Sequence, residues 1–555
     1  MFGNLRALTA INNDRDKPRE PPPPATPLDF PCCKPRRVLG PDLDDNCSLR
    51  KTFTNILRTG PGAKHIEALN VTLTDEVPLE EIIPTDCMPP LCWKDDSDTD
   101  ENSNGVSTDP SQSEKLSNGA PMPSRGKFFE LFKELSYDNE DAFRAIRRDP
   151  PRPGHRPPRL VHFRKFWDTL SIMAEYWDTS LDNYVENKED KENDRAAMDV
   201  DDLRPEAQKL TDGVLNKPVQ IEKKKMYTGR RTDTGRNMPG NFREDTVCAF
   251  VEALSWAFRC RLEHPKMQPR VKLQGMVLPL PHAISVYRQP KDKLNAKAGI
   301  LEGPLMGVFC RDQTCFRKAE EKAGEGKTEI LDLLRETGLI LMLAQKRARE
   351  GKAEEIPGEG KWWAHAPRWG GGPGGETGFA AEEETVEDAE GSSEGQRKRV
   401  KKGSKADAWR TVRPPSATWE KNITYLRIGR DTKTEYDDIY LISSINHHIS
   451  IVHTRVHLAY IDLLNETISN PNNDHHSQTR TASSDPTLKQ REPWYGLHLR
   501  RSKWFDLFIA EDRIQAMRAI WGILNSLMRE AKDGEKEATT TTNTTTVGGE
   551  DVVMN

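Results

Sequence analysis

Long apolar runs are missing from this 555-residue chain. A membrane-spanning helix needs roughly 20 consecutive apolar residues, and the densest apolar stretch here is the seven residues of 338–344. The first 24 residues also lack the apolar core and the cleavage site of a secretory signal peptide. We therefore expect an intracellular protein, in the nucleus or the cytoplasm, that does not contact membranes.

Closely spaced cysteine pairs are missing as well, and so are catalytic signatures in their usual structural context. The nine cysteines contain no Cys-x-x-Cys pair, so the spacing of a zinc finger or ribbon is not present, and we expect reduced thiols. The sequence holds no Gly-x-x-x-x-Gly-Lys-Ser/Thr motif. Its matches to Gly-x-Gly-x-x-Gly at 370–375 and to Gly-x-Ser-x-Gly at 391–395 do not follow a predicted strand, so neither has the context that a phosphate-binding turn or a nucleophile elbow requires. These absences predict no cofactor and favour a protein that is not an enzyme.

Charged residues and tryptophan are what the chain has in quantity. Charged residues make up 30% of the sequence, hydrophobic residues only 35%, and the mean hydropathy is -0.77. That composition is too polar for one large compact body, yet 12 tryptophans are too many for a chain disordered throughout. The net charge of -5 gives no overall attraction to nucleic acid. We expect folded islands separated by solvated insertions.

Shifts in composition divide the chain into solvated and ordered parts. The solvated parts are a disordered N-terminus at 1–35, a loop at 94–125, an acidic linker at 188–215, a charged linker at 381–407, a loop at 470–490 and a disordered tail at 532–555. The ordered parts are an N-terminal arm at 36–93, a helical segment at 126–187, a central block at 216–380 and a C-terminal block of strand and helices at 408–531.

Hydrophobic periodicity predicts the elements of the ordered parts. Apolar residues at 3- and 4-residue spacings indicate helices near 160–184, 243–262, 329–349 and 504–528, and three strands bounded by Pro and Gly lie between 271 and 311. The same spacing from Ile442 to Leu463 predicts one long coiled-coil-like helix over 437–468. This order of elements predicts an α+β fold, a small central sheet flanked by helices, with long disordered insertions and tails.

Two histidines of the predicted 437–468 helix share one face. His453 and His457 are four residues apart, which is the spacing of a pair of metal ligands on a helix. The segment between them lacks the glutamate that serves as general base in zinc proteases. Two interpretations stay open: half-buried structural histidines beside the apolar seam, which we favour, or a metal-binding pair.

A basic loop precedes the helix predicted at 243–262. Its basic side chains are Lys223, Lys224, Lys225, Arg230, Arg231 and Arg236. A mobile basic loop is able to neutralise several phosphates, so nucleic acid is a candidate partner. The alternative is a solvated loop that offsets the acidic linker just before it.

A second basic cluster lies in the charged linker and consists of Arg397, Lys398, Arg399, Lys401 and Lys402. A short basic run in a disordered linker is the form that a nuclear import receptor recognises. The cluster therefore predicts a nuclear localisation signal. The alternative is chance, because short basic runs are frequent in a chain this charged.

The order of elements in the central block resembles the core of the PD-(D/E)XK nuclease superfamily. The resemblance implies a carboxylate on one strand and a Glu-x-Lys on the next, which together hold Mg²⁺ against a phosphate. In this chain Glu302 would be the first carboxylate, and Phe309-Cys310-Arg311 would occupy the Glu-x-Lys place. Because phenylalanine does not bind a metal, the resemblance implies a degenerate core, with an active nuclease as the alternative.

Four phrases of the chain are distinctive: YWDTSLDNY, YRQPKDKLNAKAGILEGP, GEGKWWAHAPRWGGGPGG and DDIYLISSINHH. Together they resemble a family of uncharacterised proteins from filamentous ascomycete fungi, over most of the ordered parts. The resemblance implies lineage and intracellular residence, and it implies no activity.

The third of these phrases, at 358–375, sets Trp362, Trp363 and Trp369 among glycines. Indole rings bury large apolar areas, so we expect this segment to fold back as a clasp on the core, with an exposed recognition surface as the alternative. Taken together, the sequence predicts a non-enzymatic intracellular interaction or scaffold protein with protein partners. A nucleic-acid-binding protein or nuclease-like enzyme is the alternative.

Overall fold

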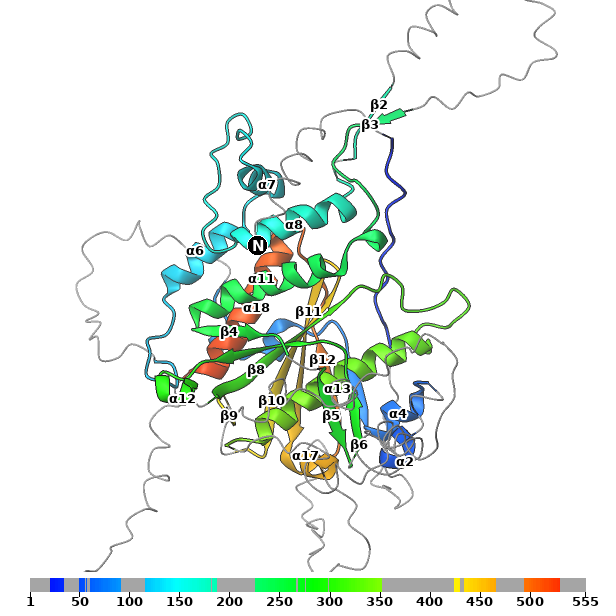
Figure 1. The fold of residues 1–555 in the computed structure, drawn as a ribbon, viewed down its shortest axis with the longest axis vertical. Coiled ribbons are helices and arrows are strands. Elements are labelled where there is room, and N and C mark those ends of the chain that lie inside the picture. The colour runs from blue at the N-terminus through cyan, green and yellow to red at the C-terminus, as the bar shows by residue number, and fades with distance from the viewer. Residues whose placement is uncertain are drawn as a thin grey trace, which may run out of the picture.

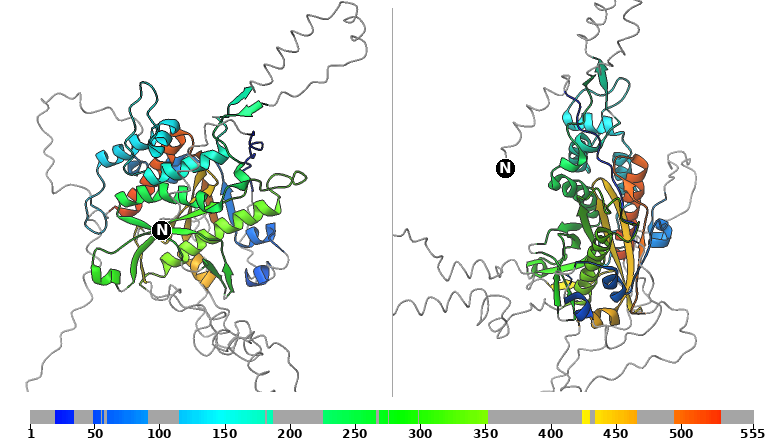
Figure 2. Two further views of the ribbon diagram at one scale, coloured as in Figure 1. Left: turned by 45° about the horizontal axis from the view of Figure 1, so that its top comes forward. Right: turned by 90° about the vertical axis from the view of Figure 1, so that its right-hand side faces the viewer.

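The computed structural model describes residues 20–33, 49–54, 56, 60–90, 115–180, 182–186, 225–265, 268–274, 276–297, 299–351, 424–429, 434–465 and 494–529. Within these residues, nine strands form one mixed sheet. Helices cover both faces of this sheet, as Figures 1 and 2 show. The α+β class predicted from the sequence is therefore confirmed.

A long hairpin and a parallel neighbour form the centre of the sheet. β10 (Tyr436–Ile445) and β11 (His448–His457) pair antiparallel over their full length. On its other side β10 runs parallel to β8 (Ile300–Arg311). Parallel neighbours need a crossover connection, and the chain between these two strands includes the long helix α13 (Lys327–Ala348).

This hairpin shows that the long helix predicted over 437–468 was wrong. Asn446 adopts the left-handed conformation (φ 52°) in the two-residue turn between the strands, and asparagine tolerates that conformation. The segment is rich in Ile and Val, which favour strands. Because both faces of a central strand are buried, its apolar residues do not alternate strictly with polar ones. The resulting run of apolar residues contains the 3- and 4-residue spacings that are typical of a helix. In the described part of the segment, α17 (Leu458–Asn465) alone is helical.

Six shorter strands extend the sheet in both directions. They are β1 (Val71–Thr74), β4 (Cys260–Glu263), β7 (Ile284–Arg288), β9 (Thr424–Leu426), β12 (Leu497–Arg501) and β13 (Phe505–Asp506). On one side β12 and β13 pair antiparallel with β11, and β1 pairs parallel with β12. On the other side β7 pairs antiparallel with β8, β4 with β7, and β9 runs parallel to the first residues of β8.

Two helical layers bury the two faces of the sheet. The first layer consists of α6 (Arg125–Leu135), α7 (Asn139–Arg147), α8 (Arg164–Trp177), α11 (Gly240–Ala257) and α18 (Ala510–Met528). The second consists of α2 (Leu49–Thr54), α4 (Ala63–Ala68), α13, α17 and a separate hairpin of β5 (Arg270–Leu273) and β6 (Met276–Pro279). α13 contacts β8 and β10 on one side and β5 on the other, which explains why residues 338–344 are apolar all round.

Smaller elements complete the described chain. They are α5 (Leu79–Ile82), α12 (Lys293–Lys297), 3-10 turns at Thr85–Cys87 and Gly235–Asn237, and a two-stranded sheet of β2 (Tyr184–Glu186) and β3 (Lys225–Tyr227).

The long amphipathic helices were predicted correctly. The helices expected near 160–184, 243–262 and 329–349 are α8, α11 and α13. The helix expected at 504–528 begins later, as α18 at Ala510, because Phe505 and Asp506 pair with β11 instead. Of the three strands expected between 271 and 311, the first is the β5–β6 hairpin and the others are β7 and β8.

Residues 20–33 form an extended segment along the molecule, where the sequence predicts disorder. The backbone N–H of Asp29 donates to the carbonyl of Thr314 at 3.0 Å, and the ring of Phe30 stacks on Trp504 with centroids 5.0 Å apart. Prolines reduce the conformational entropy that such a segment loses on ordering, so a few contacts are enough to hold it.

Several predicted features lie outside the described residues. They are the tryptophan segment at 358–375, the cluster from Arg397 to Lys402, and Lys223 and Lys224. Among the helices that the structure describes, none combines the length and the apolar character that crossing a membrane requires.

Candidate functional site

A proline-rich segment leaves the end of α7 and stays exposed. α7 begins after Asp138, whose carboxylate accepts a hydrogen bond from the N–H of Glu140 at 2.9 Å, and it ends at Arg148 in the left-handed conformation (φ 63°). Residues 149–159, the proline segment (DPPRPGHRPPR), follow without helix or strand, and all its prolines are exposed except the half-buried Pro158. Proline fixes its own φ and favours an extended conformation in the residue before it, so the sequence itself disfavours a helix in this segment.

A tight turn folds the middle of the proline segment. The N–H of His155 donates to the carbonyl of Arg152 at 2.9 Å, across Pro153 and Gly154. Gly154 has a φ of 82°, which glycine adopts without strain, and a Pro-Gly pair with this angle is the preferred centre of a type II turn. The turn brings the side chains of Arg152 and His155 to the same carboxylate.

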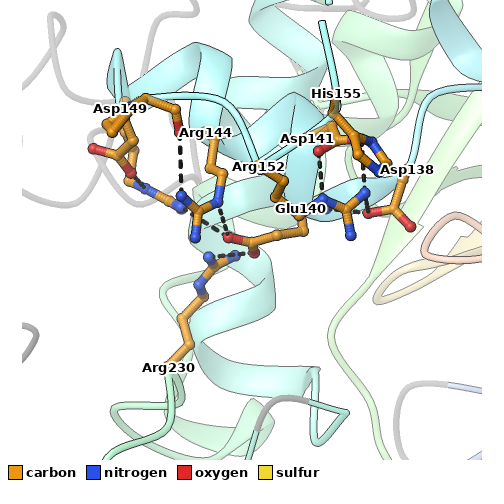
Figure 3. A network of polar contacts seen from close by, with 10 residues as sticks. Asp138, Glu140, Asp141, Arg144, Asp149, Arg152, His155 and Arg230 are labelled. Atoms are coloured by element: carbon orange, nitrogen blue, oxygen red, sulfur yellow. Dashed lines mark hydrogen bonds and ion pairs between the residues drawn. The ribbon is translucent and has the colours of Figure 1, made fainter. Parts of the chain in front are cut away.

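That carboxylate belongs to Asp141 of α7. Arg152 donates to it through Nε and Nη2 at 2.6 and 2.7 Å, and Nδ1 of His155 lies 2.9 Å from Oδ2, as Figure 3 shows. The hydrogen bonds from Arg152 lower the pKa of Asp141. A two-pronged arginine–carboxylate pair fixes direction as well as distance. We call Asp141, Arg152 and His155 the Asp141 clasp.

Glu140 ties the same helix to the start of the proline segment and to a distant loop. Its carboxylate pairs with Arg144 at 2.9 Å and with Arg230 at 2.6 Å (Figure 3). Arg144 in turn donates to the carbonyl of Pro150 at 3.2 Å. These contacts hold the backbone of the proline segment on α7, while the proline rings remain uncovered.

A polar hollow of about 360 Å³ opens beside α7. Its wall includes Asp138, Glu140, Phe508 and Arg513. Arg513 is buried, and burial lowers its pKa to about 10. Pockets for small organic ligands are mostly apolar, so a hollow lined by charged groups is not typical of a substrate pocket.

Glu302, the predicted metal carboxylate, is paired with an arginine. It lies on β8 opposite Arg288 of β7, and the two side chains form an ion pair. The side chain of Arg288 is 2% exposed. Because the carboxylate of Glu302 is neutralised by a buried guanidinium, a structural role for Glu302 is favoured over metal binding.

The place assigned to Glu-x-Lys is filled by a buried ionic network. Arg311 at the end of β8 contacts Asp332 and Glu336 of α13, and Glu336 contacts Arg501 of β12. Each of these four side chains is at most 3% exposed. The guanidinium of Arg311 also lies 4.9 Å from the ring of Phe309. The network joins α13 to two strands, and its charges are matched with one another.

The basic residues proposed for phosphate binding are largely committed elsewhere. Arg230 pairs with Glu140, while Arg231 is 3% exposed and pairs with Asp182 at 2.9 Å. Arg236 is exposed, and Lys225 begins β3.

The helical pairing predicted for His453 and His457 is not formed. Both lie on β11, where four residues span roughly 13 Å. Nε2 of His453 lies 2.8 Å from Asp438, and Nε2 of His457 lies 2.9 Å from Glu435. Each imidazole therefore has its own carboxylate, which favours the structural interpretation.

One histidine cluster was not predicted. His447 and His448, at the β10–β11 turn, lie with Asp506 of β13 so that one ligand atom from each falls within 4.8 Å of the others. Burial lowers the pKa of His448 to about 4 and raises that of Asp506 to about 6. The only signal in the sequence is the His-His doublet, because Asp506 is brought in by strand pairing far along the chain.

A second cluster of this kind consists of Glu244, His264 and His282. Nδ1 of His264 and of His282 lie 3.5 and 3.7 Å from the carboxylate, and these two imidazoles are 59% and 48% exposed. Solvated side chains of this kind are free to move apart.

Comparisons with known proteins find no relative: no family model, no curated protein and no solved structure matches the chain. The resemblances to a fungal family and to the PD-(D/E)XK core therefore stay predictions.

Proposed function

We propose that this protein is a non-enzymatic intracellular interaction protein that presents its proline segment to a partner domain. The observation that carries the proposal is an exposed proline-rich chain without helix or strand, folded once at Pro153-Gly154 and held on α7 by the Asp141 clasp. Extended proline-rich chains have little entropy to lose, and the aromatic-lined grooves of SH3 and WW domains bind them.

The sequence of the segment fits such a groove. Pro150 and Pro153 form a Pro-x-x-Pro pair, and Arg147 stands three residues before it. Arg148 and Arg156 are exposed on either side. Opposite charges across an interface steer association and fix orientation. The partner that this chemistry fits is a domain with an aromatic groove and an acidic rim.

The clasp is expected to strengthen such an interaction. Binding normally costs the ordering of the ligand chain, and a segment already held in its bound shape avoids part of that cost. The three members of the clasp are drawn from α7 and from both sides of the turn, so the folded protein supplies a shape that a free peptide lacks.

The first prediction tests the proline segment in the full-length protein. Titrated against a panel of purified SH3 and WW domains by calorimetry, the protein is expected to bind at least one with a roughly micromolar Kd. The double variant Pro150→Ala/Pro153→Ala is expected to weaken that binding about tenfold or more, because it removes the two rings that enter the groove. Asp141→Asn is expected to weaken it about threefold, because the clasp is loosened.

The double variant Pro157→Ala/Pro158→Ala is the matched control, since it removes two prolines outside the Pro-x-x-Pro pair. It is expected to change Kd less than about twofold. Failure of every domain to bind, or binding that survives Pro150→Ala/Pro153→Ala, would contradict the proposal.

The order of elements supports a second candidate, a degenerate PD-(D/E)XK-like core that binds nucleic acid without cutting it. Along the chain α11, β4, β7, β8, α13 and β10 follow in that order, and the four strands are neighbours in the sheet, with β8 parallel to β10. The order on which the resemblance rests differs at two places: its first strand, at 271–280, is the separate β5–β6 hairpin, and its last strand, after α13, is β9. We rank this candidate second because Arg288 takes up Glu302, and because Glu140 and Asp182 take up Arg230 and Arg231.

The second prediction separates the two candidates. Incubated with DNA or RNA and Mg²⁺ or Mn²⁺, the protein is expected to produce no more cleavage than buffer, because Arg288 neutralises the carboxylate of Glu302 that would hold the metal. Gel-shift binding at low salt is expected to be weak and unchanged by Arg236→Glu, an exposed site. Cleavage that Glu302→Gln abolishes would contradict the non-enzymatic proposal, and tight salt-dependent binding lost in Arg236→Glu would favour the second candidate.

A further inference from the structure

The turn between β10 and β11 holds two imidazoles beside one carboxylate. Nε2 of His447 lies 3.9 Å from Oδ1 of Asp506, and Nε2 of His448 lies 3.7 Å from Oδ2. His447 and His448 are adjacent in sequence, and their ring centroids are 4.2 Å apart. Both imidazoles therefore face the same carboxylate from neighbouring positions of one turn.

These imidazoles lack the hydrogen bonds that buried histidines normally make. The two Nδ1 atoms are buried and have no hydrogen-bond partner among the described residues. The Nε2–carboxylate separations are longer than hydrogen bonds. His447 is only 8% exposed. The nitrogens that face Asp506 are the two Nε2 atoms, so these, and not the Nδ1 atoms, are the ones that an ion beside the carboxylate would contact.

The surrounding chain holds the backbone of the turn and the carboxylate of Asp506. Asn446 of the turn accepts a hydrogen bond from Nε of the buried Arg243 at 2.6 Å. The N–H of Phe508 donates to Oδ1 of Asp506 at 2.8 Å, and the N–H of Leu507 donates to the carbonyl of His447 at 3.0 Å. A site whose ligands are held in place by their neighbours loses little entropy when an ion enters.

Aromatic rings wall the cluster. Trp177 and Phe508 lie 5.0 and 4.9 Å from the ring of His447, and Phe30 lies 5.0 Å from that of His448. The tryptophan is itself fixed, because a Cβ added at Gly235 would lie 2.3 Å from its indole. Such a shell limits water around an ion and strengthens its bonds to the protein.

We propose that His447, His448 and Asp506 form a zinc site in which an exchangeable ligand takes the fourth position. Two imidazole nitrogens and a carboxylate oxygen are a donor set that Zn²⁺ accepts, and sites with three protein ligands keep one position for water or another ligand. A tetrahedral ion with bonds of about 2.0–2.1 Å places its ligand atoms roughly 3.3 Å apart. The imidazole–carboxylate separations are 3.7 and 3.9 Å, and one ligand atom from each of the three residues lies within 4.8 Å of the others, so the set must contract to close on the ion.

The third prediction tests the site on zinc-free, full-length protein. Competition with a chromophoric chelator is expected to show one tightly bound zinc, which raises the melting temperature. His448→Ala and Asp506→Asn are each expected to weaken zinc binding about 100-fold or more, because each removes a ligand atom. Cobalt(II) is expected to give the absorption of a four-coordinate ion in the wild type and to lose it in both variants.

Two controls keep the result independent of folding. His457→Ala removes an imidazole paired with Glu435, and His264→Ala removes one from the exposed cluster; both are expected to bind zinc as the wild type does. In the wild type itself, zinc is expected to slow the modification of His448 by diethyl pyrocarbonate at least fivefold, as read by peptide mass spectrometry.

The absence of zinc binding in the wild type, or retention of tight binding by both ligand variants, would overturn the proposal. Loss of binding in His264→Ala alone would also overturn it and would assign the ion to the other cluster. None of these outcomes bears on the proline segment, so the two proposals fail separately.

Discussion

Replacement of Glu336 by alanine is expected to lower the free energy of unfolding by about 3–5 kcal/mol. Glu336 of α13 is completely buried; its carboxylate contacts Arg501 and lies 3.1 Å from Arg311, and it accepts a hydrogen bond from Ser443. Its removal leaves two buried guanidinium groups without their shared carboxylate. A domain is stable by roughly 5–15 kcal/mol, so this single change is expected to consume a large part of the total.

The size of the effect follows from the balance of charges. Burial alone would raise the pKa of Glu336, but Arg501 and Arg311 hold it below its usual value. This contribution to stability is present above the usual glutamate pKa and is lost as the pH falls through the folded value. Burial raises the pKa of the neighbouring Asp332 despite Arg311. The contribution of Asp332 to stability is therefore present at low pH and is lost as the pH rises from its usual pKa through the raised value. The positive and negative charges of the network therefore balance one another. Removing one member is expected to lower the free energy of unfolding by more than the contribution of a single ion pair.

Urea unfolding followed by circular dichroism measures the loss. Glu336→Gln keeps the volume and part of the hydrogen bonding, so an intermediate loss is expected. Glu130→Ala is the matched control: that glutamate is 61% exposed and pairs with Lys127, and its removal is expected to change stability by less than about 0.5 kcal/mol. A loss below about 1 kcal/mol in Glu336→Ala would show that the network does not hold the sheet to α13.

Helices were predictable from the sequence where one continuous stripe of the chain is buried. In α8, for example, Phe166, Leu170 and Met173 repeat at helical spacing because one side of the helix packs on the core. The β10–β11 hairpin was not predictable in this way. Ile439, Leu441 and Ile442 are all buried because helical layers cover both faces of the sheet, and burial on two faces erases the alternation that identifies a strand.

The candidate sites show the same limit at the level of side chains. The proline segment is visible in the sequence as a break between helices, but its attachment to α7 depends on Asp141, which no local pattern connects to Arg152. The partner of Glu302 is likewise a strand neighbour, Arg288, that element order does not identify. Periodicity predicts which surfaces are buried, whereas the pairing of charges depends on register and turn geometry, which the three-dimensional fold decides.

The second large effect is expected at Arg513, which ties α18 to the start of α7. Replacement of Arg513 by alanine is expected to lower the free energy of unfolding by about 4 kcal/mol. Its guanidinium is 4.7 Å from the ring of Trp167 and is 1% exposed. It donates hydrogen bonds to the carbonyls of Leu135, Tyr137, Leu507 and Phe508 and to the side chain of Asn139.

Removing the guanidinium leaves these acceptors without their donor in a buried site. Each hydrogen bond to a charged group contributes about 1.5–3 kcal/mol, but water entering from the adjacent hollow replaces part of them. We therefore expect a loss well below the sum of the separate bonds. Arg513→Lys keeps the charge on one nitrogen, reaches fewer acceptors, and is expected to lose about half as much.

Hydrogen exchange read by mass spectrometry localises the effect. Arg513→Ala is expected to accelerate exchange in α7 more than in α13, because the lost bonds end at the start of α7. Arg518→Ala on the same helix is the control: that side chain is 15% exposed and pairs with Glu80, and a loss of about 1 kcal/mol is expected.

Since α7 carries Asp141, the Arg513 variant is also expected to weaken binding of the partner domain to the proline segment. If Arg513→Ala accelerates exchange equally in α7 and α13, then Arg513 does not stabilise α7 in particular, and the expected link between Arg513 and the proline segment is contradicted.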